Sequence, residues 1–168
     1  MDRLTPMANA VGALLKEQKC TVAVAESAAG GLISAALLAI PGASAYYLGG
    51  GVIYTREARR TLMGAPEHVV TMRGATEEYA LLMARMIRQR LGATFGLCES
   101  GASGPTGNRY GDAAGHACIA VAGPIEQAIT LETRSLDREV NMWQFATAAL
   151  ELLEKTIRQT SGTGGSRA

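Results

Sequence analysis

The chain has 168 residues, 48% of them hydrophobic and 18% charged, and its 16 Lys and Arg against 15 Asp and Glu give a net charge of +1. This length predicts one domain that can bury roughly 70% of the surface of its unfolded chain. The balanced charge, with no long block of either sign, argues against nucleic acid as a partner, and no apolar stretch of about 20 residues is present to cross a membrane.

The cysteines and the first residues indicate a reducing compartment. Cys20, Cys98 and Cys118 lack a C-x-x-C spacing and stand in apolar runs, so we expect buried thiols and neither a disulfide nor a zinc site. The N-terminus lacks the apolar core of a secretory signal. We therefore expect a cytoplasmic protein.

The first half of the chain predicts helices and strands in alternation. Thr5-Pro6 is a typical helix start. Residues 20–25 form a short apolar run, which is typical of a strand buried on both faces. A small-residue loop over 26–31 leads into a helix that ends before Pro41-Gly42. The aromatic and β-branched residues of 45–54 predict a second strand.

The second half contains a well-defined helix and three strands. Thr76 is placed to cap a helix with one apolar stripe, and Gly92 is placed to end it. The expected elements are, in chain order, a short helix over 56–63, a helix over 76–91, strands over 94–98, 116–122 and 125–133, and a closing helix capped by Asp137.

This order predicts an α/β fold, a three-layer αβα sandwich with a mixed sheet. Gly123-Pro124 joins the last two strands as a hairpin, which gives the sheet an antiparallel part. We assign residues 1–158 to a single domain. Residues 159–168 are polar and glycine-rich, and we expect them to form a disordered tail.

Two glycine-bearing loops, each directly after an expected strand, are the candidate ligand site. Free backbone amides in such loops can hold an anion, although glycines there also serve tight packing of a helix on a strand. Neither loop matches a Walker motif or the G-x-G-x-x-G pattern. The candidate ligand-binding residues are Glu26, Ser27, Gly30 and Gly31 in the first loop and Ser100, Gly101, Gly104, Pro105 and Gly107 in the second.

Ser44, Tyr54 and Arg59 form a further set: a serine after a helix end, a tyrosine ending a strand, and a cation five residues later. Without further information, the favoured interpretation of these three residues is a turn serine, an interfacial tyrosine and a solvated arginine. His68 and His116 have no acidic or cysteine partner at ligand spacing, so no metal or other cofactor is expected.

The chain resembles a known family, the C-terminal domain of the competence/damage-inducible protein CinA, which also occurs alone as nicotinamide mononucleotide deamidase. The resemblance covers about residues 14–150. The matching segments are Val-Ala-Glu-Ser-x-x-Gly-Gly (24–31), Pro-Gly-x-Ser-x-Tyr-Tyr (41–47), Gly-Gly-Val-Ile-Tyr-x-x-x-Ala-Arg (50–59), Ser-Gly-x-x-Gly-Pro-x-Gly (100–107) and the strand start at Gly115.

The resemblance implies metal-independent hydrolysis of the amide of a nicotinamide nucleotide, with Ser44 as nucleophile, Tyr54 as assisting hydroxyl and the residue at 59 as base. The family has lysine there, but this chain has Arg59. A guanidinium stays protonated and has no lone pair, so it cannot accept the proton of a serine. Two further departures replace polar contacts: Ala28-Ala29 for Cys-Thr, and Met142-Trp143 for arginines.

Three hypotheses remain open at this point. The chain is an altered nicotinamide mononucleotide amidohydrolase, a nucleotide-binding or regulatory module in which Arg59 clamps an anion, or an interaction domain that binds no small molecule. We expect a small-molecule nucleotide ligand, no nucleic acid or membrane partner, and a homo-oligomer, because the family forms dimers and Tyr46, Tyr47 and Leu48 form an apolar cluster.

Overall fold

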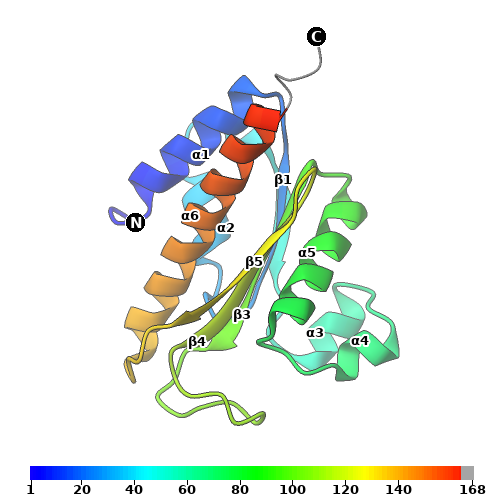
Figure 1. Ribbon diagram of the computed structural model, residues 1–168, viewed down its shortest axis with the longest axis vertical. Coiled ribbons are helices and arrows are strands. Elements are labelled where there is room, and N and C mark those ends of the chain that lie inside the picture. Colours follow the sequence, from blue (N-terminus) through cyan, green and yellow to red (C-terminus); the bar gives the residue numbers. More distant parts are fainter. Residues whose placement is uncertain (164–168) are drawn as a thin grey trace.

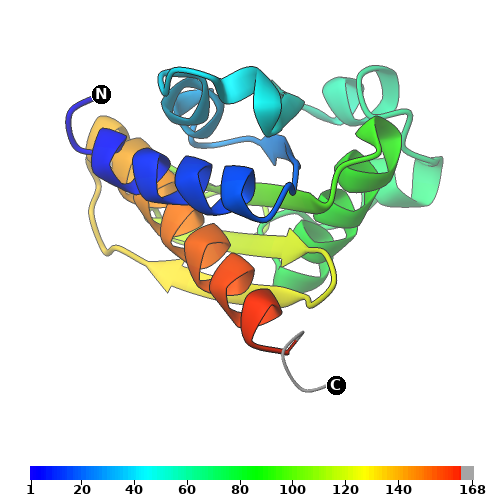
Figure 2. The ribbon, with the colours of Figure 1, turned by 90° about the horizontal axis from the view of Figure 1, so that it is seen from above.

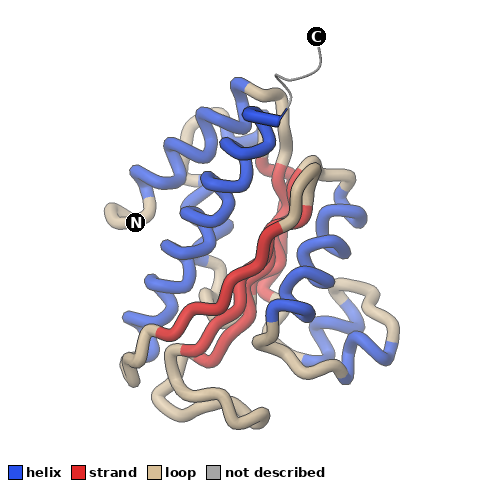
Figure 3. The backbone as a smooth tube through the Cα atoms, viewed as in Figure 1, coloured by secondary structure: helices blue, strands red, loops and turns tan. Residues whose placement is uncertain are grey.

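A five-stranded mixed sheet stands between two layers of helices in the computed structural model, which describes residues 1–163 (Figures 1 and 3). The strands are β1 (Val22–Glu26), β2 (Tyr47–Val52), β3 (Phe95–Ala102), β4 (His116–Ala122) and β5 (Gln127–Glu132). The helices are α1 (Thr5–Glu17), α2 (Leu32–Leu38), α3 (Arg56–Thr61), α4 (Glu67–Thr71), α5 (Glu77–Leu91) and α6 (Arg138–Thr163), with a short 3₁₀ helix, η1, at Ala43–Ala45.

The strand order is β2-β1-β3-β4-β5, and the direction of the strands decides where the loops gather. β1 pairs in parallel with both β2 and β3, whereas β3–β4 and β4–β5 are antiparallel. The segments that follow β1, β2 and β3 therefore leave the sheet at the same edge. This arrangement confirms the predicted αβα sandwich with a mixed sheet.

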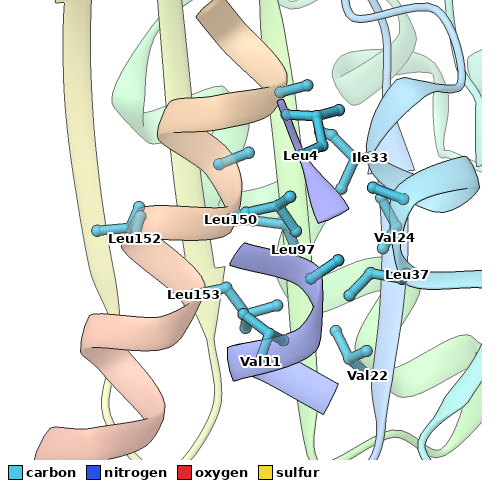
Figure 4. Packing of buried hydrophobic residues seen from close by; sticks show 14 of the residues in the cluster. Leu4, Val11, Val22, Val24, Ile33, Leu37, Leu97, Leu150, Leu152 and Leu153 are labelled. Carbon is cyan, nitrogen blue, oxygen red and sulfur yellow. The ribbon is translucent and has the colours of Figure 1, made fainter. Parts of the chain in front are cut away.

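The helices divide into two groups, one on each face of the sheet. Figures 1 and 2 show α1, α2 and α6 on one face, with α1 alongside α6, and α3, α4 and α5 on the other. The larger core lies under the first group, where leucines of α6 meet Val11 of α1, Ile33 of α2 and Leu97 of β3 (Figure 4). The second core packs α5 against alternate residues of β1, β3 and β4.

Three of the predicted caps are confirmed. The Thr76 hydroxyl accepts a hydrogen bond from Tyr79 N at 3.1 Å, and Gly92 ends α5 with a φ of 65°. Asp137 Oδ1 accepts from Val140 N at 3.0 Å at the start of α6. α1 differs from expectation, since Thr5 lies inside the helix and its hydroxyl donates to the Met1 carbonyl.

One helix and two element boundaries differ clearly from the sequence predictions. α4 was not predicted, because five residues are too few for a helical stripe. β3 continues three residues beyond the expected loop start, through Ala102, because its end pairs with the start of β4. α6 extends through Thr163, beyond the predicted boundary at 159, and the hydroxyls of Thr160 and Ser161 donate to carbonyls one turn earlier. Residues 164–168 of the predicted tail lie outside the described residues.

The apolar cluster expected at an oligomer surface is mostly core. Tyr46 is fully buried, and its hydroxyl donates to the Leu37 carbonyl at 2.6 Å. Tyr47 is half-buried, which leaves Leu48 as the exposed member. Among residues 1–163, no helix combines the length and apolarity needed to span a bilayer.

Candidate functional site

Two neighbouring hollows lie beyond the ends of β1 and β2 and beside β3. The first, here called the Arg59 pocket, has a volume of about 240 Å³, and the second, the Arg138 pocket, about 200 Å³. Tyr54, Gly101 and Asn108 line both, so the two form one continuous site. A larger hollow of about 400 Å³ between the N-terminus and the start of α6 contains none of the predicted site residues.

Arg59 forms the buried wall of the first pocket. It lies on α3 and is only 8% exposed. Its Nη1 donates to the carbonyl oxygens of Val70 at 3.3 Å and Met72 at 3.0 Å, at the end of α4. The guanidinium also lies over the ring of Tyr79, with Cζ 4.3 Å from the ring centre. The short helix α4, which the sequence did not predict, therefore anchors this arginine.

Tyr54 and Ser27 lie with Arg59 in the same pocket. Tyr54 follows β2, is 57% exposed, and its hydroxyl accepts from Arg138 Nη2 at 3.2 Å. Ser27, which follows β1, and Ser100 of β3 line the same pocket. The predicted association of Tyr54 and Arg59 with the first residues of both loops is thus present.

Ser44 is not part of this group. It is exposed on η1, before the start of β2, whereas Tyr54 follows the end of β2. A strand of six residues spans roughly 20 Å, so the two hydroxyls stand at opposite ends of the sheet. The structure does not bring Ser44 to Arg59, and Ser27 is the serine that β1 delivers to the pocket.

The amides of the first loop are already occupied by carboxylates of the chain itself. Glu99 Oε2 accepts from Ser27 N at 3.0 Å and Ala29 N at 2.8 Å. Glu26 accepts from the amides of Gly31, Ile33 and Ser34 and from the Ser34 hydroxyl, at 2.5–3.1 Å. The backbone donors that this loop would use to hold an external anion are therefore taken. Glu26, Gly30 and Gly31 line neither pocket.

The second loop is differently arranged. Gly104 and Gly107 line the Arg138 pocket, whereas Pro105 lines neither and is exposed. The backbone N–H groups of Thr106 and Gly107 find no acceptor within residues 1–163. Arg138 reaches across from α6, with Nη1 donating to the Gly104 carbonyl at 2.6 Å.

Positive charge surrounds the two pockets, although the whole chain is nearly neutral. Arg59 and Arg109 line the first pocket and Arg138 the second. Burial favours a higher pKa for Tyr110, but hydrogen bonding to Arg56 and the charges of Arg59 and Arg109 lower the pKa below its ordinary value. Among the described residues, no aspartate or glutamate lines either pocket.

Two further titratable groups near the site, Glu99 and His116, have displaced pKa values. Burial raises the pKa of Glu99 to about 7 despite the amides that bond its Oε2, and its Oε1 is buried without a partner. Burial alone lowers the pKa of His116, but hydrogen bonds with Glu132 and the Ala75 carbonyl raise it overall. Ala75 lines the Arg59 pocket, so His116 stands directly behind that wall.

Sequence reasoning missed several residues of the site. Arg109, Tyr110 and Asn108 lie on the loop after β3, and Arg138 begins α6, far along the chain. An asparagine whose side chain accepts from the amides of residues 110 and 112 is a recognisable turn signal, but nothing local connects Arg138 to Tyr54. No three His, Cys, Asp or Glu side chains within residues 1–163 are placed to hold a metal ion.

Comparison with known proteins identifies a family model and several similar proteins. The family model described as the CinA C-terminal domain matches residues 4–157. A CinA-like protein of Desulfosudis oleivorans is 39% identical over 153 residues, which are 88% of this chain but 36% of that protein. A CinA-like protein of Desulforapulum autotrophicum is 36% identical over 94% of this chain and 38% of its own length. This chain thus spans little more than a third of these curated relatives.

Solved structures have the same fold over nearly their whole length. The competence/damage inducible protein CihA of Agrobacterium tumefaciens is 27% identical, with a TM-score of 0.84 over 92% of this chain and 95% of that one. A CinA superfamily protein of Klebsiella pneumoniae is 24% identical, with a TM-score of 0.85 over 93% of this chain and 98% of that one. With the match over residues 4–157, these findings place the chain: it belongs to the CinA C-terminal domain family.

Proposed function

We propose that this domain binds a pyridine mononucleotide at the joined Arg59 and Arg138 pockets without hydrolysing an amide at an enzymatic rate. The observation that carries the proposal is the state of Arg59. Its Nη1 is fixed by two carbonyl oxygens and its plane lies on Tyr79, so it is a rigid buried cation and not a proton acceptor.

The size and charge of the site support a small anionic ligand. Together the two hollows fall within the range of about 300–1,000 Å³ that is usual for small-molecule sites. Arg138, Arg109 and the free amides of Thr106 and Gly107 provide donors for a phosphate. Tyr54, which lines both hollows, provides a ring against which a nucleotide can pack.

Amide hydrolysis is the second candidate, and the position of Ser27 favours it. Its hydroxyl lies in the pocket with Tyr54, so it can attack a carboxamide carbon, after which ammonia would leave and water would release the acid. Attack requires a group that takes the serine proton. General-base assistance is typically worth about 10²–10⁴ in rate, and Arg59 cannot give it.

Two measurements on the purified domain test the proposal. Calorimetric titration with nicotinamide mononucleotide and its acid form, nicotinate mononucleotide, should show binding of at least one, and the domain incubated with the amide should release no ammonia above background. Arg59→Lys restores an amine that can be deprotonated, so we expect ammonia release to appear and to vanish in Arg59→Lys combined with Ser27→Ala.

Ser44→Ala is the matched control, because Ser44 lies at the other end of β2 and its loss should change neither binding nor turnover. Absence of binding to both nucleotides would overturn the proposal. Rapid ammonia release by the unaltered domain would replace it with the hydrolytic candidate.

A further inference from the structure

One edge of the Arg59 guanidinium carries hydrogens for which the protein provides no acceptor. Nη1 is used by the carbonyl oxygens of Val70 and Met72. Nε is buried without a partner, and Nη2 makes no hydrogen bond within residues 1–163. Nε and Nη2 form the side of a guanidinium that pairs with both oxygens of a carboxylate. Nε is covered by the protein, so Nη2 is the nitrogen of this side that the pocket leaves open to a ligand.

The space beside this edge is kept open by a glycine. A Cβ built on Gly74 would stand 2.8 Å from Arg59 Nη2 and 3.6 Å from Ser100 Oγ, and all three residues line the Arg59 pocket. The Ser100 hydroxyl oxygen already accepts from Ala75 N at 3.2 Å, so its own hydrogen is available to a ligand. Arg59 Nη2 and the Ser100 hydroxyl therefore each offer a hydrogen to a ligand at this point.

A buried cation without an acidic partner distinguishes an acid from an amide. A carboxylate presents only acceptors and carries the charge that a buried guanidinium needs, whereas a carboxamide presents two N–H hydrogens of its own. No aspartate or glutamate among the described residues lines the pocket to accept those hydrogens. Leaving them unpaired in a buried position is costly.

Resting on the function proposed above, we propose that the Arg59 pocket selects a pyridine mononucleotide whose ring bears a carboxylate over one whose ring bears a carboxamide. The ring carboxylate accepts from Nη2 of Arg59 and from the Ser100 hydroxyl, and the phosphate lies toward Arg138 and the amides of Thr106 and Gly107. The domain accordingly recognises the acid that amide hydrolysis yields.

Calorimetric titration of the unaltered domain with nicotinate mononucleotide and with nicotinamide mononucleotide tests this selectivity. We expect the acid to bind at least about tenfold more tightly, as a charge-assisted hydrogen bond from Arg59 warrants. Arg59→Met should remove the preference by weakening binding of the acid alone. Arg60→Met, which removes an exposed arginine from the same helix, should retain the preference.

Gly74→Ala is a second probe, because the added methyl group crowds Nη2 while the charge of Arg59 remains. It too should reduce the preference for the acid. Equal or tighter binding of the amide by the unaltered domain would overturn the selectivity and leave the proposed function standing. If Arg59→Met weakened the binding of both ligands equally, Arg59 would be contacting the phosphate that they share. That result would also overturn the selectivity. Binding of neither ligand would overturn the proposed function and this inference with it.

Discussion

The segment after β1 and the wall formed by Arg59 lie at the same edge of the sheet, but they treat their polar groups in opposite ways. Between residues 27 and 34, five backbone amides donate to the carboxylates of Glu26 and Glu99. At Arg59, one nitrogen is held by the protein and two are left without a partner.

Whether the polar groups have partners within the protein distinguishes a structural loop from a ligand site better than the number of glycines does. Buried donors that the chain satisfies itself stabilise a conformation, whereas a rigid donor left unsatisfied beside a hollow costs free energy unless a ligand completes it. Changes in the first segment should therefore act mainly on stability, and changes around the pockets mainly on binding.

The largest expected effect is from Glu26→Ala. This substitution leaves the amides of Gly31, Ile33 and Ser34 without their acceptor. At about 1–3 kcal/mol for each unsatisfied buried donor, partly relieved by water, we expect the free energy of unfolding to fall by about 3–5 kcal/mol. Urea denaturation measures the loss. Glu57→Ala, on the exposed surface of α3, is the control, and an equal loss in both variants would contradict the assignment.

Glu99→Gln should act through pH. The pKa of Glu99 is about 7 in the folded protein against 4.5 for the free group, so the folded state binds the proton more tightly. Stability from this group is then greatest below about pH 4.5 and is lost as the pH rises through 7. At pH 8 the glutamine variant should be more stable than the unaltered protein by about 2–3 kcal/mol.

At pH 5 the two proteins should nearly coincide, because the carboxyl group is then protonated in the folded state. Urea denaturation at pH 5 and at pH 8 gives the difference, in which other titrating groups cancel. Parallel pH profiles of the two proteins would mean that Glu99 does not carry this dependence.

His116 should show a pH dependence of the same sign, with a smaller effect. Its folded pKa lies above 6.5, so its stabilisation is complete below pH 6.5 and is lost as the pH rises through the raised value. Glu132 of β5, Asp112 of the loop and Cys118 of β4 face the ring, together with the Ala75 carbonyl. Because the Glu132 side chain is half exposed, the protonated His116 should add only about 1 kcal/mol to the free energy of unfolding.

Thermal unfolding of the unaltered protein and of His116→Gln at pH 6 and pH 9 checks this prediction. The difference between them should shrink at the higher pH and also in 1 M salt, because salt screens the pair with Glu132. A difference that grows with pH would show that the imidazolium is not the stabilising form.

Most of the fold is local enough to follow from the sequence. The apolar run of β1, the caps at Thr76 and Gly92, and the hairpin at Gly123-Pro124 each act within a few residues. The end of β3 cannot be predicted from the local sequence, because Ser100 and Gly101 become strand only through pairing with Cys118 and Ala117 on β4.

The site was predicted in part. Tyr54, Arg59 and the first residues of both loops come together because parallel strands deliver them to one edge. Ser44 was placed with them because it is near in sequence, but the length of β2 separates it. The occupation of the first loop by Glu99 joins residues 72 positions apart, and no local pattern contains that pairing.

Tyr54→Phe should change stability least, and it tests most directly the comparison between the segment after β1 and the pockets. The tyrosine is exposed, and its hydroxyl accepts one hydrogen bond, from Arg138, so unfolding free energy should change by less than about 0.5 kcal/mol. Binding of the mononucleotide should nevertheless weaken severalfold, because Arg138 loses one of the two hydrogen bonds that orient it at the second pocket. Tyr47→Phe removes a half-buried phenol hydroxyl from β2, outside both pockets, and should leave binding unchanged. If Tyr54→Phe lost as much stability as Glu26→Ala, the pocket would depend on its hydrogen bonds for stability in the same way as the segment after β1. The distinction between the two regions would then fail.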